Sequence, residues 1–351
     1  MTRPARTISC LAALLAVSWP ASAADRERAP TLFEVQSDKR SASSPISLSR
    51  PFEEPHPGVA TAIVAIHDGV DDAPDWLRTL TDLAAERGLA DQVFVAAPQF
   101  LDESDIDPDS IDDILVARWT GGSWIDGATA TGPTHILSYH VADSVLERLA
   151  DPRHFPDLRQ VTVAGFAEGA DFVQRLALVS EAADRLEARG IRVRFAVGGA
   201  SSFLRFGAER PTADGGSAVP PATRCERYND WPFGPREAPQ TLREQDKPIR
   251  FFAERYARRD VVALVGTLDT PPLPGDGCEA AAQGAGPVAR LANHLLDMKN
   301  RRLEPDEAIA VPAVGHDPAE MFAKPPVFDL LLGLPTDAVR ARLQATKGTP
   351  T

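Results

Sequence analysis

One segment of the chain has the pattern of a catalytic turn but lacks its reactive side chain. Residues 161–170 read Val-Thr-Val-Ala-Gly-Phe-Ala-Glu-Gly-Ala, an apolar stretch that enters a turn flanked by Gly165 and Gly169. A strand, a sharp turn and a helix in this order present the nucleophile of many hydrolytic sites, and the glycines let the turn pack tightly. The tip of this turn is Ala167, whose methyl group cannot attack a carbonyl carbon. The pattern therefore predicts a nucleophile turn without a nucleophile.

Two later segments supply the side chains that would complete a catalytic triad. The apolar run 261–266 is followed by Asp269, and the run 309–314 is followed by His316. The order nucleophile, acid, histidine is typical of one class of serine hydrolase, in which the acid orients the imidazole and the imidazole acts as general base. Taken alone, Asp269 could be a turn residue and His316 a buried structural histidine. Together with the turn, they favour the remnant of a triad.

Backbone N–H groups beside the turn would stabilise the negative charge of a tetrahedral intermediate. The N–H of Glu168 directly follows the tip of the turn. A second donor is expected in the loop 67–69, His-Asp-Gly, which follows the strand predicted at 61–66. We assign that role to the N–H of Asp68, although its carboxylate would oppose the stabilisation of an anion. The alternative for Asp68 is a surface turn.

Two cysteines, Cys225 and Cys278, form an even pair in the part of the chain that follows the leader described below. In an oxidising compartment such a pair favours a disulfide, and the alternative is two buried free thiols. Close to the first cysteine, Tyr228 and Trp231 are expected at the mouth of the cleft, together with His67. The alternative for Trp231 is that it packs beneath its own loop.

The first residues have the pattern of a secretory leader. Basic residues precede an apolar stretch at 8–19, and Ala-Ser-Ala at 21–23 is typical of a cleavage site. The stretch is too short to span a bilayer as a helix. We predict a signal peptide over 1–23 and a secreted or periplasmic protein. An uncleaved membrane anchor is the alternative.

The remaining chain predicts a single α/β domain over residues 60–340. Apolar strand-like runs alternate there with amphipathic helical stretches, which indicates a largely parallel sheet. Residues 24–59 are expected as an extended arm or an edge hairpin, residues 209–240 as a Pro- and Gly-rich excursion, and residues 341–351 as a flexible tail. The other predicted elements are helices at 74–88 and 138–149 and strands at 93–97 and 192–197, with Asp317 as the N-cap of a further helix.

These motifs resemble those of secreted bacterial and fungal α/β-hydrolases related to lipases and esterases, which commonly carry Gly-His-Ser-Ala-Gly-Gly at the nucleophile turn. The resemblance extends from about Thr61 to Phe322 and includes Tyr-Asn-Asp-Trp at 228–231 and Val-Gly-His-Asp at 314–317. It implies the α/β-hydrolase fold, with a mostly parallel central sheet and helices on both faces.

The sequence departs from the family pattern at the residues of the nucleophile turn, which would carry out the reaction. His, Ser, Ala and Gly of the family's turn are replaced by Phe166, Ala167, Glu168 and Ala170. An engineered serine-to-alanine trap would change one residue and leave its neighbours alone. Four changes indicate relaxed selection on the turn, so the family's activity does not carry over with its fold.

Three functions are therefore open. The first is a non-catalytic homologue that binds a small molecule or an ester-like ligand in the old cleft. The second is an active hydrolase in which His316 and Asp269 activate a water, or in which Ser138, Ser201 or Ser202 serves as nucleophile. The third is a structural or partner-binding protein that makes no use of the cleft.

The composition excludes several partners. A formal net charge of -13 argues against nucleic acid and anionic membranes. The histidines are scattered, and the acidic run 102–109 lacks the glycine and the terminal glutamate of a calcium loop. No phosphate-binding glycine loop is present. The sequence thus predicts no cofactor, no metal site and no membrane-spanning helix after the leader.

Overall fold

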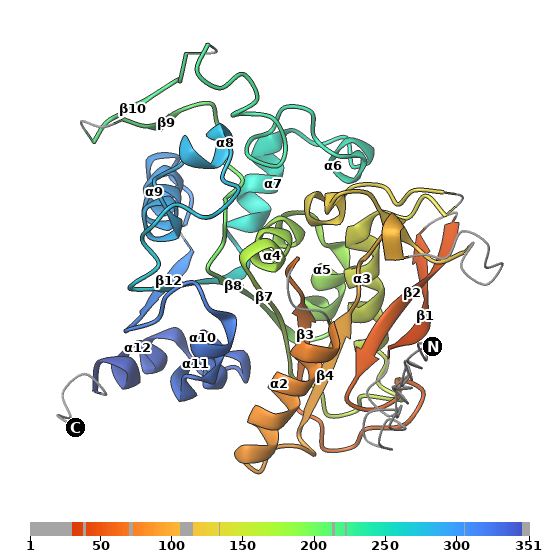
Figure 1. Cartoon of the computed structure of the whole chain (residues 1–351). Coiled ribbons are helices and arrows are strands. Elements are labelled where there is room, and N and C mark those ends of the chain that lie inside the picture. Colours follow the sequence, from red (N-terminus) through yellow and green to blue (C-terminus); the bar gives the residue numbers. More distant parts are fainter. Residues whose placement is uncertain are drawn as a thin grey trace, which may run out of the picture.

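The computed structural model (Figure 1) describes residues 30–37, 40–69, 73–105, 115–132, 134–212, 215–221, 223–304 and 306–345. The signal peptide predicted at 1–23 lies outside these residues, as do residues 106–109 of the acidic run. None of the helices within these ranges is long and apolar enough to cross a bilayer.

A single large sheet organises the molecule, with strands in the order β1-β2-β4-β3-β7-β8-β11-β12. β2 runs antiparallel to β1 and to β4, and every other neighbouring pair is parallel. The carboxyl ends of the parallel strands consequently share one edge, where ligands bind in open sheets of this kind. The strands are β1 (Thr31–Ser37), β2 (Arg40–Leu48), β3 (Thr61–Ile66), β4 (Val93–Pro98), β7 (Gln160–Phe166), β8 (Arg192–Gly198), β11 (Asp260–Gly266) and β12 (Glu307–Val311).

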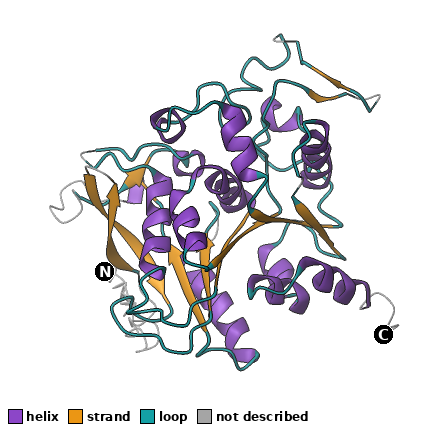
Figure 2. Cartoon of the chain, turned by 180° about the vertical axis from the view of Figure 1, so that it is seen from behind, coloured by secondary structure: helices purple, strands orange, loops and turns teal. Residues whose placement is uncertain are grey.

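Helices cover both faces of the sheet (Figure 2), as predicted. In β3, Val64 belongs to one hydrophobic core and Ile63 and Ala65 to the other, because successive side chains point to opposite faces. One face is covered by α3 (Ser138–Leu149), α4 (Ala167–Val179), α5 (Glu181–Ala188), α7 (Ile249–Tyr256) and α9 (Pro287–Asn300), and the other by α2 (Ala73–Glu86), α10 (Pro318–Ala323), α11 (Pro325–Leu331) and α12 (Thr336–Ala345). The short helices α6 (Gln240–Glu244) and α8 (Cys278–Ala281) lie in connections.

The helix predicted at 138–149 is found with the same bounds, and the helix predicted at 74–88 is α2. Of the two forms considered for the N-terminal segment, the edge hairpin is observed, since β1 and β2 pair over 31–46 and join the sheet. The hairpin is held there by inward-facing side chains such as Val35 and Ile46, both fully buried.

Two predicted boundaries were wrong. The strand predicted at 309–314 ends at Val311, because Pro312 has no N–H to continue the ladder. The flexible tail predicted from residue 341 is helical as far as Ala345 in α12. There Val339 and Leu343, four residues apart, bury their side chains against the core.

Candidate active-site cleft

The predicted nucleophile turn joins β7 to α4 and keeps the strained backbone of a catalytic turn. Ala167 has a φ of 47°, in the left-handed region that costs a residue with a Cβ about 1–2 kcal/mol. A Cβ at Gly165 would lie 2.4 Å from the carbonyl carbon of Gly169, and one at Gly169 would lie 2.4 Å from the carbonyl oxygen of Ile66. Both glycines are therefore required for the close approach of turn, helix and β3. The turn persists although its tip carries no reactive group.

The acid and the histidine meet as the sequence predicts. Nδ1 of His316 lies 2.8 Å from Oδ2 of Asp269. The carboxylate is buried, with 1% of its side chain exposed, whereas 28% of the imidazole is exposed. The imidazole also packs against Phe166, with ring centroids 4.8 Å apart. A histidine oriented by a buried carboxylate thus stands beside the tip of the turn.

Backbone contacts between two loops fix this pair. The N–H of Leu268 donates to the carbonyl of Val314 at 2.9 Å, and the N–H of Ala313 donates to the hydroxyl of Thr267 at 3.0 Å. Asp317 caps α10 by accepting a hydrogen bond from the N–H of Glu320, as predicted. The loops after β11 and β12 are therefore locked to each other independently of the side chains that could react.

The loop after β3, where the sequence predicts the second oxyanion donor, contacts the residue that follows the tip of the turn. The contact is made by the N–H of Gly69, one residue beyond Asp68. This N–H is already engaged, because it donates to Oε2 of Glu168 at 2.9 Å. Asp68 lines the cleft with a mostly buried side chain. The side chain of Glu168, which follows the tip of the turn, thus accepts the hydrogen bond that the Gly69 N–H can donate.

His67, expected at the cleft, is instead a structural residue. Its Nε2 accepts a hydrogen bond from the N–H of Phe100 at 2.9 Å, so the ring proton sits on Nδ1, which donates to the carbonyl of Asp68 at 2.6 Å. The ring packs against Phe100 and Trp124 and is 4% exposed. His67 therefore ties the loop after β3 to the end of β4 and does not line the cleft.

A cleft of about 580 Å³ opens over the turn and the histidine. Its apolar wall includes Ile125, Phe166, Phe233 and Leu273. Its carboxylates come from four segments of the chain, since two of them lie in α4: Asp68, Asp126, Glu168, Asp171 and Asp276. No lysine or arginine is among the residues that line it in the part of the chain that the structure describes.

Burial perturbs two of these carboxyl groups. Burial raises the pKa of Asp126 to about 6, with Asp171 adding to the shift and the guanidinium of Arg175 opposing it. Burial also raises the pKa of Asp171. The Asp171 carboxylate accepts hydrogen bonds from the N–H and the hydroxyl of Ser202, at 3.0 and 2.7 Å. The negative charge of the carboxylates that line the cleft is only partly compensated. The cleft therefore disfavours anionic ligands.

The serines considered as substitute nucleophiles are differently placed. Ser138 is fully buried and donates to the carbonyl of Trp124 at 2.6 Å. The hydroxyl of Ser202 is bound to Asp171, as described above, and Ser201 lines the cleft. Within the described ranges, no hydrogen bond joins any of the three hydroxyls to His316.

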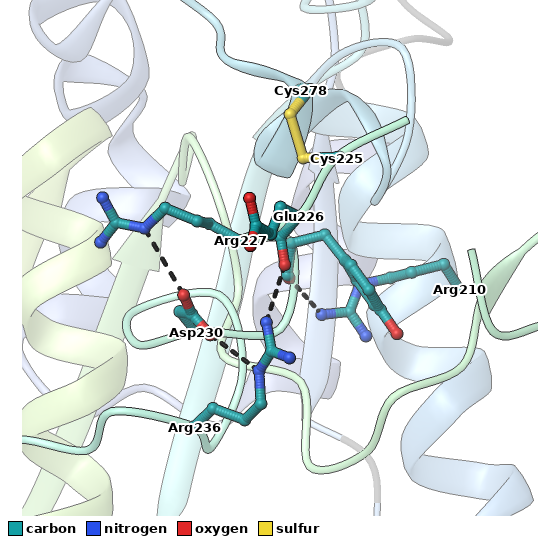
Figure 3. The surroundings of a disulfide bond; sticks show 8 residues. Arg210, Cys225, Glu226, Arg227, Asp230, Arg236 and Cys278 are labelled. Carbon is teal, nitrogen blue, oxygen red and sulfur yellow. Dashed lines mark hydrogen bonds and ion pairs between the residues drawn. A yellow bond between two sulfur atoms is a disulfide. The ribbon is translucent and has the colours of Figure 1, made fainter. Parts of the chain in front are cut away.

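The predicted disulfide is present and anchors the excursion (Figure 3). Cys225 and Cys278 are bonded across a sequence separation of 53, so the excursion is linked to α8. Arg227 and Arg236 pair with Asp230 and fold the segment that follows the first cysteine. The bridge thus connects the two stretches that carry Phe233 and Leu273 into the cleft wall.

Tyr228 and Trp231 lie beneath this segment and not in the cleft. The ring of Tyr228 packs against the guanidinium of Arg210, 4.9 Å from its centroid. Nε1 of Trp231 donates to the carbonyl of Asp126 at 2.6 Å, and the indole is 8% exposed. Each aromatic finds its polar partner inside the protein, so the alternative of packing beneath the loop holds for Trp231. The residues that reach the cleft are the next two, Pro232 and Phe233.

Potential metal ligands cluster at one place in the described residues, at Cys225, Cys278 and Glu279. The two sulfurs are bonded to each other and offer no thiolate to a metal ion.

The sequence matches no protein-family model and no curated protein. Solved structures are similar in fold. LpqC, a poly(3-hydroxybutyrate) depolymerase from Bordetella parapertussis, is 18% identical with a TM-score of 0.56, over 90% of this chain and 94% of that one. Poly(aspartic acid) hydrolase-1 from Sphingomonas sp. KT-1 is 14% identical with a TM-score of 0.52, over 83% and 94%.

The chain has the α/β-hydrolase fold. At these identities, the similarity extends to the fold alone. Within this fold the turn, Asp269 and His316 follow β7, β11 and β12 in the chain order predicted from the sequence.

Proposed function

We propose that this protein is a non-catalytic α/β-hydrolase homologue that binds a small molecule or an ester-like ligand in the cleft above Ala167. The observation that carries the proposal is the alanine itself, held in the left-handed conformation of a catalytic turn beside a paired His316 and Asp269. The scaffold of the reaction is kept and its nucleophile is missing.

The size of the effect of a missing nucleophile supports a loss of turnover. Removal of the nucleophile from a working triad lowers turnover by roughly a million-fold. A residual acceleration of about a thousand-fold normally comes from the oxyanion donors and substrate binding. Here the Gly69 N–H already donates to the Glu168 carboxylate, so it is not available to a substrate oxygen and the residual acceleration should be smaller. The cleft volume, about 580 Å³, is in the range of small-molecule sites.

A second candidate is hydrolysis by an activated water. The intact contact between His316 and Asp269 favours it, because an oriented imidazole can take a proton from water while the hydroxide attacks an ester carbonyl. Such an activity would survive Ser201→Ala and would disappear in His316→Ala.

We also propose that the protein is exported. The leader-like pattern at 1–23 and the bridge between Cys225 and Cys278 support an oxidising compartment. Separation of a periplasmic or culture fraction from the cytoplasm, with the mature N-terminus sequenced, tests this. A protein that retains residues 1–23 in the cytoplasm would contradict it.

The binding proposal is tested with p-nitrophenyl esters of increasing chain length and their parent acids as probes, using thermal shift and ligand-observed NMR. Leu273→Trp fills the cleft, and Leu296→Trp adds the same bulk on the exposed surface of α9. We expect the wild type and Leu296→Trp to bind esters, and Leu273→Trp to lose binding. Equal binding by all three proteins would place the ligand outside the cleft and contradict the proposal.

A further inference from the structure

The side chain of Glu168 has an unusual position for the residue that follows the tip of a nucleophile turn. Glu168 lies in the first turn of α4, and its side chain reaches the loop after β3, 99 residues away in sequence, where Oε2 accepts the N–H of Gly69 at 2.9 Å. The N-terminal end of a helix favours a negative charge, so the start of α4 also stabilises the carboxylate there. Two independent features of the backbone therefore hold the side chain in place.

The loop after β3 and the nucleophile turn are in close contact, so this hydrogen bond lies beside the tip of the turn. A Cβ at Gly169 would lie 2.4 Å from the carbonyl oxygen of Ile66 and 2.6 Å from that of His67, so the backbone of the turn abuts the strand end that leads to Gly69. Donors of an oxyanion site lie about 2.7–3.1 Å from the anionic oxygen that they stabilise. The Glu168 oxygen meets that distance to Gly69.

This donor is already engaged within the protein. A Cβ built on Gly69 would lie 2.8 Å from Oε2 of Glu168, so the carboxylate packs directly on the glycine. An N–H group donates one proton, and here the acceptor is part of the protein. A substrate oxygen would have to displace a carboxylate that carries its own charge.

We propose that Glu168 occupies the oxyanion position of the cleft with its own carboxylate and blocks it independently of the missing nucleophile. This inference rests on the proposed function. It adds that two separate changes disabled the site, so restoring the nucleophile alone does not restore the chemistry.

The experiment compares ester hydrolysis by Ala167→Ser with that of double variants. Ala167→Ser/Glu168→Ala removes the blocking oxygen. Ala167→Ser/Glu168→Gln removes the charge but keeps an oxygen that can accept the Gly69 N–H. Ala167→Ser/Glu320→Ala is the matched control, because Glu320 is an exposed carboxylate on α10 outside the cleft. The substrate is p-nitrophenyl butyrate, and each variant is first compared by thermal unfolding.

We expect Ala167→Ser and the Glu320 control to hydrolyse the ester at similar, low rates. Ala167→Ser/Glu168→Ala should be faster by about a hundred-fold, which is the lower end of the effect of one oxyanion donor. The glutamine double variant should stay close to Ala167→Ser. In the wild-type background, Glu168→Ala should shift the Gly69 amide resonance in NMR spectra, a readout that needs no catalysis.

The inference is overturned if Ala167→Ser alone is as fast as Ala167→Ser/Glu168→Ala, whether both are active or both are silent. An unmoved Gly69 resonance in a folded Glu168→Ala protein would overturn it as well. Neither result bears on the proposed function, which fails separately if the wild type itself turns over esters.

Discussion

The turn at Ala167 and the loops that carry Asp269 and His316 lie side by side, yet they present different parts of the arrangement expected of a hydrolytic site. The turn has a left-handed φ of 47° at its tip, but the side chain there is the unreactive methyl group of Ala167. The two loops retain both side chains and the 2.8 Å contact between them. Backbone geometry that is fixed by packing is therefore present here without a nucleophilic side chain at the tip.

The physical reason is that the turn is part of the core. Gly165 and Gly169 let α4 approach β7 and β3 closely, and the strands behind them are buried on both faces. These close contacts are made at Gly165 and Gly169 and do not involve the side chain at the tip. Loss of either glycine would force strands and helix apart.

The largest expected effect is on stability, when a methyl group is added to the turn. The same addition beside His316 serves as the comparison. Gly169→Ala places a Cβ against backbone oxygens of β3 and its loop, and we expect destabilisation of about 3 kcal/mol or more, since backbone atoms must move. Gly315→Ala, beside His316, meets nothing within 4 Å and should change stability by less than about 0.5 kcal/mol. Urea unfolding measures both. Equal effects would show that the turn is not held by packing.

A second effect concerns Asp126, one of the carboxylates that line the cleft over the turn and His316. The pKa of Asp126 is about 6 in the folded protein against an ordinary value of 3.8, so between these pH values the folded state binds more protons than the unfolded state. This group therefore makes stability fall as pH rises from about 4 to about 6, by up to about 3 kcal/mol.

Asp126→Asn removes that loss, so at pH 7 it should be more stable than the wild type, and the advantage should vanish below pH 4. Asp337→Asn, with 95% of its carboxylate side chain exposed, is the control and should follow the wild type. Unfolding free energies measured from pH 3.5 to pH 7 decide the matter. A constant difference between Asp126→Asn and wild type would contradict the assigned pKa.

The smallest effect tests the strain at the tip. Ala167→Gly relieves a left-handed conformation, and the larger entropy of glycine in the unfolded chain offsets part of the gain, so we expect stability to be unchanged or raised by up to about 1 kcal/mol. Ala341→Gly, on the exposed surface of α12, should instead cost about 1 kcal/mol. Thermal unfolding compares them. A similar loss in both variants would mean that the tip stores no strain.

The sequence predicted the parts of the site that depend on local pattern and chain order. The glycine spacing around Ala167, the strands that precede Asp269 and His316, the Asp317 cap and the paired cysteines are all found. Each is specified by neighbouring residues, by the alternation of strands and helices, or by the even count of cysteines.

The sequence did not predict features that depend on how distant segments meet. The contact of Glu168 with Gly69 requires the loop after β3 to approach the first turn of α4, and nothing near either residue signals it. The burial of Tyr228 and Trp231 depends on partners far away in the chain, Arg210 and the carbonyl of Asp126. The acidic wall is likewise assembled from scattered segments.

The most direct test of the central claim is the rate of p-nitrophenyl butyrate hydrolysis by the wild type and by His316→Ala, measured at equal concentration. We expect the two rates to be the same and no greater than that of an inert protein, because the imidazole has no nucleophile to activate. A wild-type rate that is well above this background and is lost in His316→Ala would contradict the account and establish a working hydrolase.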